Sequence, residues 1–198
     1  MRFRRAFWIL LAVIGPAFAD DLRMGASLGA GWFTAPTVSS QAEALRPSFV
    51  LITDGWMERG PLSLGLELSN NLCYQTRKPS SGLADNELIW LTSGVVLLGN
   101  SIEIPDFPAK VRLAFGGGGV HVLNQLDRGS QTFLQESWGP EFHLVCLWER
   151  ELGPNGLVLI RLAGVYSSTF ASEIQGTALR SPGDWSRVEF SMGWSWRG

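Results

Sequence analysis

The sequence is poor in charge, holds only two cysteines, and has no long apolar run beyond its N-terminus. Charged side chains make up 17% of the 198 residues, against about 25% in soluble domains. No later stretch reaches the roughly 20 apolar residues that a membrane-spanning helix needs. The apolar content of 45% and the aromatic content of 11% exclude a disordered chain. A single folded domain, without a helical membrane span, is therefore expected.

Motifs that would hold a cofactor or a metal are also missing. The chain has no Walker loop, HExxH, GxSxG or EF-hand pattern, and no CxxC or Cys/His cluster, so we predict neither a cofactor nor a metal site. The run Gly116–Gly119 lacks the Lys-Ser/Thr of a phosphate loop, and we interpret it as a bend or as room for a neighbour. Cys73 and Cys146 are expected on opposite faces of distant strands, as unpaired thiols.

The N-terminus reads as a secretory signal over residues 1–19. Arginines precede an apolar stretch from Ala6 to Ile14, and Ala17-Phe18-Ala19 supplies the small residues of a cleavage site. The mature domain would then be 20–198. Loss of the N-terminal arginines leaves it with more acids than bases, which argues against a nucleic-acid partner.

The mature chain alternates apolar and polar side chains with a period of two. The even positions from Leu22 to Trp32 are apolar, and the positions between them are Arg, Gly or Ser. The even positions from Val188 to Trp196 are apolar as well, and the positions between them are Glu, Gly or Ser. This period is that of β-strands with one apolar face. We predict eight strands, at Leu22–Phe33, Ser48–Met57, Leu62–Tyr74, Leu88–Gly99 (with an ambiguous phase), Val111–Leu123, Glu141–Glu149, Leu157–Ser168 and Trp185–Arg197.

The connections between these segments alternate in length. Glu58–Pro61 and Leu152–Gly156 are tight turns, and Asn100–Lys110 is a somewhat longer one. The long connections are Thr34–Pro47, Gln75–Glu87, Asn124–Gly139 and Thr169–Asp184. This rhythm is typical of an outer-membrane barrel whose N-terminus is periplasmic and whose long loops face outside. The predicted fold is therefore all-β, an eight-stranded antiparallel up-and-down transmembrane β-barrel in the cell outer membrane.

Tryptophans and charges favour a membrane barrel over a soluble one. Tryptophans gather near the strand ends, as expected at membrane interfaces; they are Trp32, Trp90, Trp138 and Trp185 at the loop ends, and Trp56, Trp148, Trp194 and Trp196 at the turn ends. The polar face carries about one charge per strand, of both signs, which should pair inside a narrow barrel. These charges are Arg23, Asp54, Glu67, Arg112, Glu149, Arg161 and Glu189.

The last strand carries a further sign of the outer membrane. Phe190–Trp196 resembles the C-terminal signature by which bacterial outer-membrane proteins reach their assembly machinery, although Arg197-Gly198 follow the final aromatic residue here. The resemblance implies the barrel-assembly machinery as a partner.

The second half, from Phe115 onward, resembles the lipid A 3-O-deacylase (PagL-like) barrels, which are outer-membrane esterases. That family carries His-x-Ser-Asn at the end of strand seven, then an Asn-Pro-Gly loop and a carboxylate. The matching positions here are Tyr166-Ser-Ser168-Thr and Ser181-Pro-Gly-Asp184. The resemblance implies Ser168 as nucleophile, Tyr166 in the place of the histidine and Asp184 as the acid. Tyrosine, with a pKa of about 10, is a poor base at neutral pH.

Neither of the two histidines is predicted to supply the base that the serine lacks. His121 is predicted to face outward near the outer end of the fifth strand, separated from the serine strand by one intervening strand, a distance of roughly 10 Å. His143 is predicted to face inward on the sixth strand, as a hydrogen-bonded interior residue.

Three functions follow as hypotheses. The first is a structural or interaction barrel at the cell surface, without catalysis, whose partners include outer-membrane lipid and lipopolysaccharide. The second is a lipid A deacylase-like esterase acting through Ser168. The third is a soluble periplasmic lipocalin-like carrier, which would turn its apolar face inward.

Overall fold

The computed structural model describes residues 22–34, 46–77, 85–104, 109–153, 156–175 and 183–197. The predicted signal, residues 1–19, lies outside this part. Among the described residues, no helix is long and apolar enough to span a membrane. The strands are β1 (Leu22–Thr34), β2 (Arg46–Arg59), β3 (Leu62–Arg77), β4 (Asp85–Glu103), β5 (Lys110–Arg128), β6 (Gln131–Glu151), β7 (Gly156–Ser168), β8 (Phe170–Gln175) and β9 (Asp184–Arg197).

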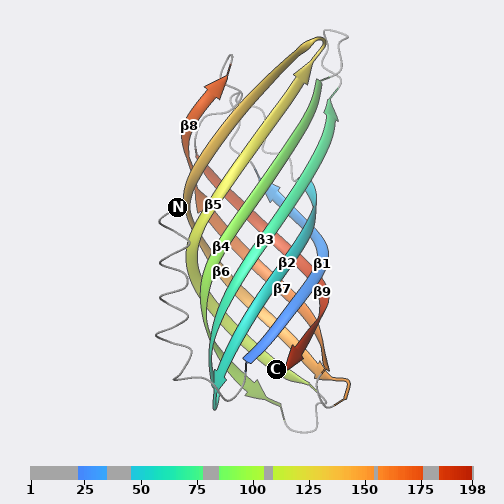
Figure 1. Cartoon of the computed structure of the whole chain (residues 1–198), viewed down its shortest axis with the longest axis vertical. Coiled ribbons are helices and arrows are strands. Elements are labelled where there is room, and N and C mark those ends of the chain that lie inside the picture. Colours follow the sequence, from blue (N-terminus) through green and yellow to red (C-terminus); the bar gives the residue numbers. More distant parts are fainter. Residues whose placement is uncertain are drawn as a thin grey trace.

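These strands close into one antiparallel barrel (Figure 1). From β1 to β7 each strand pairs with the next one in sequence, β7 also pairs with β9, and β9 returns to pair with β1 from Arg23↔Arg197 to Thr34↔Ser186. The short β8 continues β7 beyond Thr169 and pairs with the upper part of β6. Counting β7 and β8 as one position gives the eight-stranded up-and-down barrel, so the predicted fold is confirmed.

The apolar side chains face outward and the polar ones face inward. On β1, Leu22, Met24 and Leu28 are exposed, whereas Arg23 and Ser27 are buried. A soluble lipocalin-like carrier, the third hypothesis, requires the opposite arrangement, with its apolar side chains inside and its polar side chains outside. The third hypothesis is therefore wrong, because its apolar face would be solvated while charges filled its core.

The outward apolar face has the height of a bilayer. It runs from Leu22 to Trp32 on β1 and from Trp138 to Trp148 on β6, close to the 9–11 residues of a tilted transmembrane strand. Beyond it, the outward side chains of the β5–β6 hairpin are more polar. There Asp127 accepts hydrogen bonds from Gln125 Nε2 at 3.2 Å and from Thr132 Oγ1 at 2.8 Å.

One predicted long loop is wrong. Residues Asn124–Gly139 continue β5 and β6 as a paired ladder that ends in a two-residue turn at Gly129-Ser130. Gly129 has φ of +60°, the left-handed conformation that a tight hairpin turn needs and that glycine adopts without strain. In Figure 1 this hairpin rises above the rest of the barrel at the top of the view. β3 and β4 likewise continue into the predicted loop Gln75–Glu87, to Arg77 and from Asp85.

Two tryptophans do not belong to the predicted interface belts. Trp56 and Trp185 are each 3% exposed and point into the barrel. Trp56 lies under the guanidinium of Arg112, whose Cζ is 4.5 Å from the ring centroid. Outward aromatic residues do occupy the upper strand ends, where Trp32, Tyr74, Trp90, Trp138 and Phe170 are exposed.

Apolar side chains fill part of the interior. One cluster, toward the loop end, contains Phe33, Cys73, Ile89, Leu91, Val120, Val122 and Trp185. A second contains Trp56, Val95, Leu97, Ala114, Val145, Leu147, Ala163 and Val165. The alternation of the fourth predicted segment was ambiguous because both faces of β4 are apolar, one toward lipid and the other toward this interior cluster. Cys73 is buried and Cys146 is half-buried on the outer face, so they lie on opposite faces as predicted, and no disulfide joins them.

The glycine run of β5 lies against the backbone of β4. A Cβ added at Gly116 or Gly118 would overlap the carbonyl oxygen of Val96 or Gly94. At Gly119, the same addition would come only within 3.7 Å of the Gly139 oxygen, an ordinary contact. The run therefore gives room to a neighbouring backbone, which side chains at positions 116 and 118 would push away.

We expect Gly118→Ala to destabilise the barrel and Gly119→Ala to leave it nearly unchanged. The forced shift at Gly118 should lower the free energy of unfolding by about 1–3 kcal/mol, and the control should stay within about 0.5 kcal/mol. Urea unfolding of the refolded mature chain in detergent measures both. Equal stability of the two variants would contradict the close approach of β4 and β5.

Candidate functional site

An ion network crosses the middle of the barrel around Arg161 of β7. Its guanidinium is 1% exposed and donates to both carboxylate oxygens of Glu67 on β3, from Nε at 3.0 Å and from Nη2 at 2.6 Å. A third hydrogen bond, at 2.9 Å, reaches Glu189 on β9. Arg161 thus ties strands on opposite sides of the barrel.

The network continues through Arg187 of β9 and His143 of β6. Arg187 donates to Glu189 at 3.0 Å and to both oxygens of Glu141 at 2.9 and 3.1 Å. His143 Nε2 meets the same Glu141, and its Nδ1 lies 3.2 Å from Glu67 Oε1. His143 is therefore the buried, hydrogen-bonded residue that the sequence predicted.

Opposite charges meet throughout this arrangement. The guanidiniums of Arg161 and Arg187 lie among the carboxylates of Glu67, Glu141 and Glu189, and the His143 ring is placed between Glu67 and Glu141. Charges removed from water are tolerated in the barrel because each meets an opposite charge.

A second ion cluster lies toward the turn end. Arg23 of β1 pairs with Glu149 at 3.2 Å and with Glu58 at 3.2 Å. Arg112 also pairs with both glutamates, and Lys110 reaches Glu58 at 2.9 Å. Each predicted interior charge named above is inside, with Asp54 accepting from Trp56 Nε1 at 3.0 Å.

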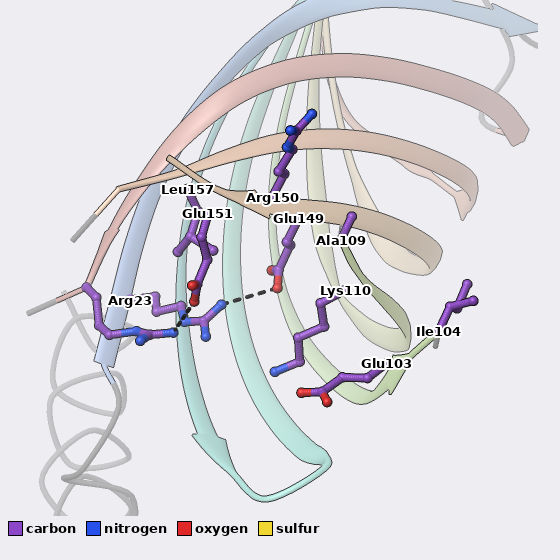
Figure 2. Close-up of a pocket in the computed structure, with 10 residues that line it drawn as sticks. Arg23, Glu103, Ile104, Ala109, Lys110, Glu149, Arg150, Glu151 and Leu157 are labelled. Carbon is purple, nitrogen blue, oxygen red and sulfur yellow. Dashed lines mark hydrogen bonds and ion pairs between the residues drawn. The ribbon is translucent and has the colours of Figure 1, made fainter. Parts of the chain in front are cut away.

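This cluster forms the wall of a pocket of about 750 Å³ at the turn end. Figure 2 shows Arg23 reaching across to Glu149, with the side chains of Lys110 and Glu103 directed toward one another. The pocket walls carry cations and anions in similar number. Most of their charge is already paired within the protein, so the pocket has no strong preference for a charged ligand.

The residues implied by the deacylase resemblance come together on the outer face. Ser168 is the last residue of β7 and lies opposite Asp184, the first residue of β9. The Tyr166 side chain is exposed, and Tyr166 lies on the same face of β7 two residues before Ser168. The next residue, Thr169, extends this pairing by one backbone hydrogen bond, in which its amide donates to the Gly183 oxygen at 3.0 Å.

The histidines have other partners. His121 faces outward, stacked on Trp138 with 4.0 Å between the ring centroids, and its Nε2 is 3.8 Å from Glu136. His143 is enclosed by the interior glutamates. No described contact joins either ring to Ser168, so the structure brings the predicted nucleophile and acid together without an imidazole base.

The sequence analysis did not single out several interior ions. Arg46 and Glu87 form a buried pair at 2.8 Å near the loop end, and Glu58 was assigned to a turn. Their strands begin earlier or end later than predicted, which hid their inward phase. In the described part of the chain, no group of three or more His, Cys, Asp or Glu side chains could hold a metal ion.

Solved structures similar to this chain are bacterial outer-membrane barrels. Neisserial surface protein A has a TM-score of 0.54 at 10% identity, covering 88% of this chain and 96% of that one. A major outer membrane protein from Thermus thermophilus has a TM-score of 0.57 at 11% identity, covering 89% and 99%. Ail, the attachment invasion locus protein of Yersinia pestis, has a TM-score of 0.52 at 10% identity, covering 90% and 99%.

These likenesses show the fold, which is that of outer-membrane β-barrels. No family model matches the chain, and no curated protein matches it.

We expect Arg161→Met to destabilise the barrel strongly, because it leaves Glu67 and Glu189 buried without their shared cation. Removal of one partner from a buried ion pair costs about 3–5 kcal/mol. The control is Arg197→Gln, which breaks the exposed pair with Glu151 and should cost at most about 1 kcal/mol. Urea unfolding in detergent compares the two, and similar losses would show that the central network contributes little.

Proposed function

We propose that this chain is an outer-membrane β-barrel that acts at the cell surface as a structural or interaction protein. The observation that supports the proposal is the distribution of apolar, aromatic and polar side chains over the outer face of the barrel. Its apolar band has the height of a bilayer, carries aromatic residues at its upper edge and gives way above them to a paired hairpin with more polar outward side chains. The projecting part of β3–β6 is the surface that partners would meet.

A conducting pore is not part of this proposal. Eight strands leave an interior just wide enough for side chains, and ion pairs and two apolar clusters occupy it. The barrel therefore offers its surfaces, not its lumen, to other molecules.

Two partners follow from this location. The apolar band would contact outer-membrane lipid, including lipopolysaccharide in the outer leaflet. The β9 segment Phe190–Trp196, which turns Phe190, Met192 and Trp196 outward, would be the segment that the barrel-assembly machinery engages.

A lipid A deacylase-like esterase is the second candidate, supported by the juxtaposition of Ser168, Tyr166 and Asp184 on the outer face. A serine hydroxyl needs a base to take its proton before it can attack an ester. The group nearest to that role is Asp184, which lies opposite Ser168 on β9 and whose carboxylate is a weak base at neutral pH. This arrangement favours a non-catalytic role.

The surface proposal predicts which turns are reachable from outside. A short polar epitope inserted between Gly129 and Ser130 should bind antibody on intact cells, because this turn ends the projecting hairpin. The matched control, the same epitope between Gly60 and Pro61, should be labelled only after permeabilisation. Labelling of the Gly60 site alone on intact cells would reverse the proposed orientation.

The esterase candidate is tested by Ser168→Ala. We expect the lipid A acylation pattern, measured by mass spectrometry, to be the same in cells with the wild-type chain, the variant or no chain at all. Loss of one acyl chain only when Ser168 is present would establish the esterase. A heat-dependent shift of the variant on SDS gels verifies that its barrel is folded.

A further inference from the structure

Arg150 of β6 is an exposed cation on the outer face of the barrel at its turn end. The preceding residue, Glu149, is buried in the interior, and Figure 2 shows the two side chains leaving β6 on opposite sides. In the described part of the chain, no hydrogen bond or ion pair involves the Arg150 guanidinium. This cation is therefore accessible from outside the barrel and has no counterion within that part.

The outer surface around Arg150 is apolar. Its register partner on β7 is Val158, and Trp148 lies two residues earlier on the same face of β6. Leu152, which follows Arg150 in the chain, and Ile104, which follows the end of β4, are also exposed. Arg150 is therefore placed at the edge of the lipid-facing surface, among side chains that cannot hydrogen-bond to it through a carboxylate.

Two tryptophans of β9 lie on the same part of the outer surface. Trp194 is the register partner of Val158, and the exposed Trp196 is the register partner of Gly156. The Trp194 ring covers Gly156, where an added Cβ would overlap it. Because indole rings favour the membrane interface, this arrangement places Arg150 at the depth of the lipid headgroups.

A guanidinium keeps its positive charge in proteins, and a charge at a lipid-facing surface is costly unless an opposite charge meets it. In the headgroup layer that opposite charge is a phosphate, to which a guanidinium donates two parallel hydrogen bonds. The sign of the outer face supports this choice of end. Arg59 of β2 is a second exposed base at the turn end, whereas the charges described on the outer face at the loop end include the carboxylates of Asp127, Glu136 and Asp184.

We propose that Arg150 binds the phosphate of a glycerophospholipid in the leaflet at the turn end, with an acyl chain lying along Trp148 and Val158. The inference rests on the proposed function, because it requires the outer face to stand in lipid. It assigns a phosphate-binding position to the outer surface of β6, β7 and β9, away from the ion pairs of the interior and from Ser168 at the loop end.

The test is native mass spectrometry of the refolded mature chain, released from detergent micelles after incubation with phosphatidylglycerol or monoglucosyl diacylglycerol of equal chain length. The wild-type chain should retain the phospholipid over the uncharged glucosyl lipid. Arg150→Gln should reduce phospholipid retention about fivefold, and Arg150→Lys, which keeps the charge, should preserve most of it. The matched control Arg197→Gln removes a cation at the same end that pairs with Glu151, and it should not change retention.

Equal phospholipid retention by Arg150→Gln and Arg197→Gln would overturn the site, and equal retention of the two lipids by the wild-type chain would overturn the phosphate as its ligand. Displacement of the phospholipid by excess inorganic phosphate would assign the position to a soluble anion instead of a lipid. The heat-dependent shift on SDS gels is recorded on every sample. Its absence in the wild-type chain would refute the membrane barrel itself, whereas a normal shift without phospholipid preference refutes only the Arg150 site.

Discussion

The pairing of β9 with β1 is the constraint on which the rest of the structure depends. Lipid offers no hydrogen bonds to a backbone, so a sheet can stand in a membrane only if it has no open edge. The β1–β9 ladder removes that edge along nearly the whole of both strands. Closure at eight strands then forces half of every strand's side chains into a space that is only as wide as the side chains themselves.

That narrow space explains why the interior ions are arranged as they are. Backbone hydrogen bonds join only neighbouring strands, so they do not fix the cross-section of the barrel. Arg161 on β7 reaches Glu67 on β3, and Arg23 on β1 reaches Glu149 on β6. These pairs span the lumen and act as cross-braces, while the apolar clusters fill the remaining volume. Stability thus resides in the interior, which leaves the outer surface free to vary.

The sequence predicted the fold because alternation with one apolar face is a direct consequence of strand geometry. It predicted the inward charges for the same reason. When one face of a strand is apolar and contacts lipid, a charged side chain on the other face must point into the barrel. It missed the projecting hairpin because Asn124–Gly139 is polar and contains glycines, and composition alone does not separate a loop from a paired strand in water. The prediction placed Trp56 and Trp185 at the membrane interface because it used only their position along the strand. It did not ask whether each side chain points outward or inward.

The candidate site was harder to predict than the fold, and the two histidines show why. His143 and His121 lie on neighbouring strands, and the sequence gives each the correct face. Their chemistry depends on partners that are distant in sequence. His143 lies between Glu141 of its own strand and Glu67, which comes to it from across the barrel, whereas His121 stacks on the Trp138 ring with its Nε2 3.8 Å from Glu136. The same side chain is thus part of an ion network on one face and a ring-stacked residue on the other, and only the strand register distinguishes them.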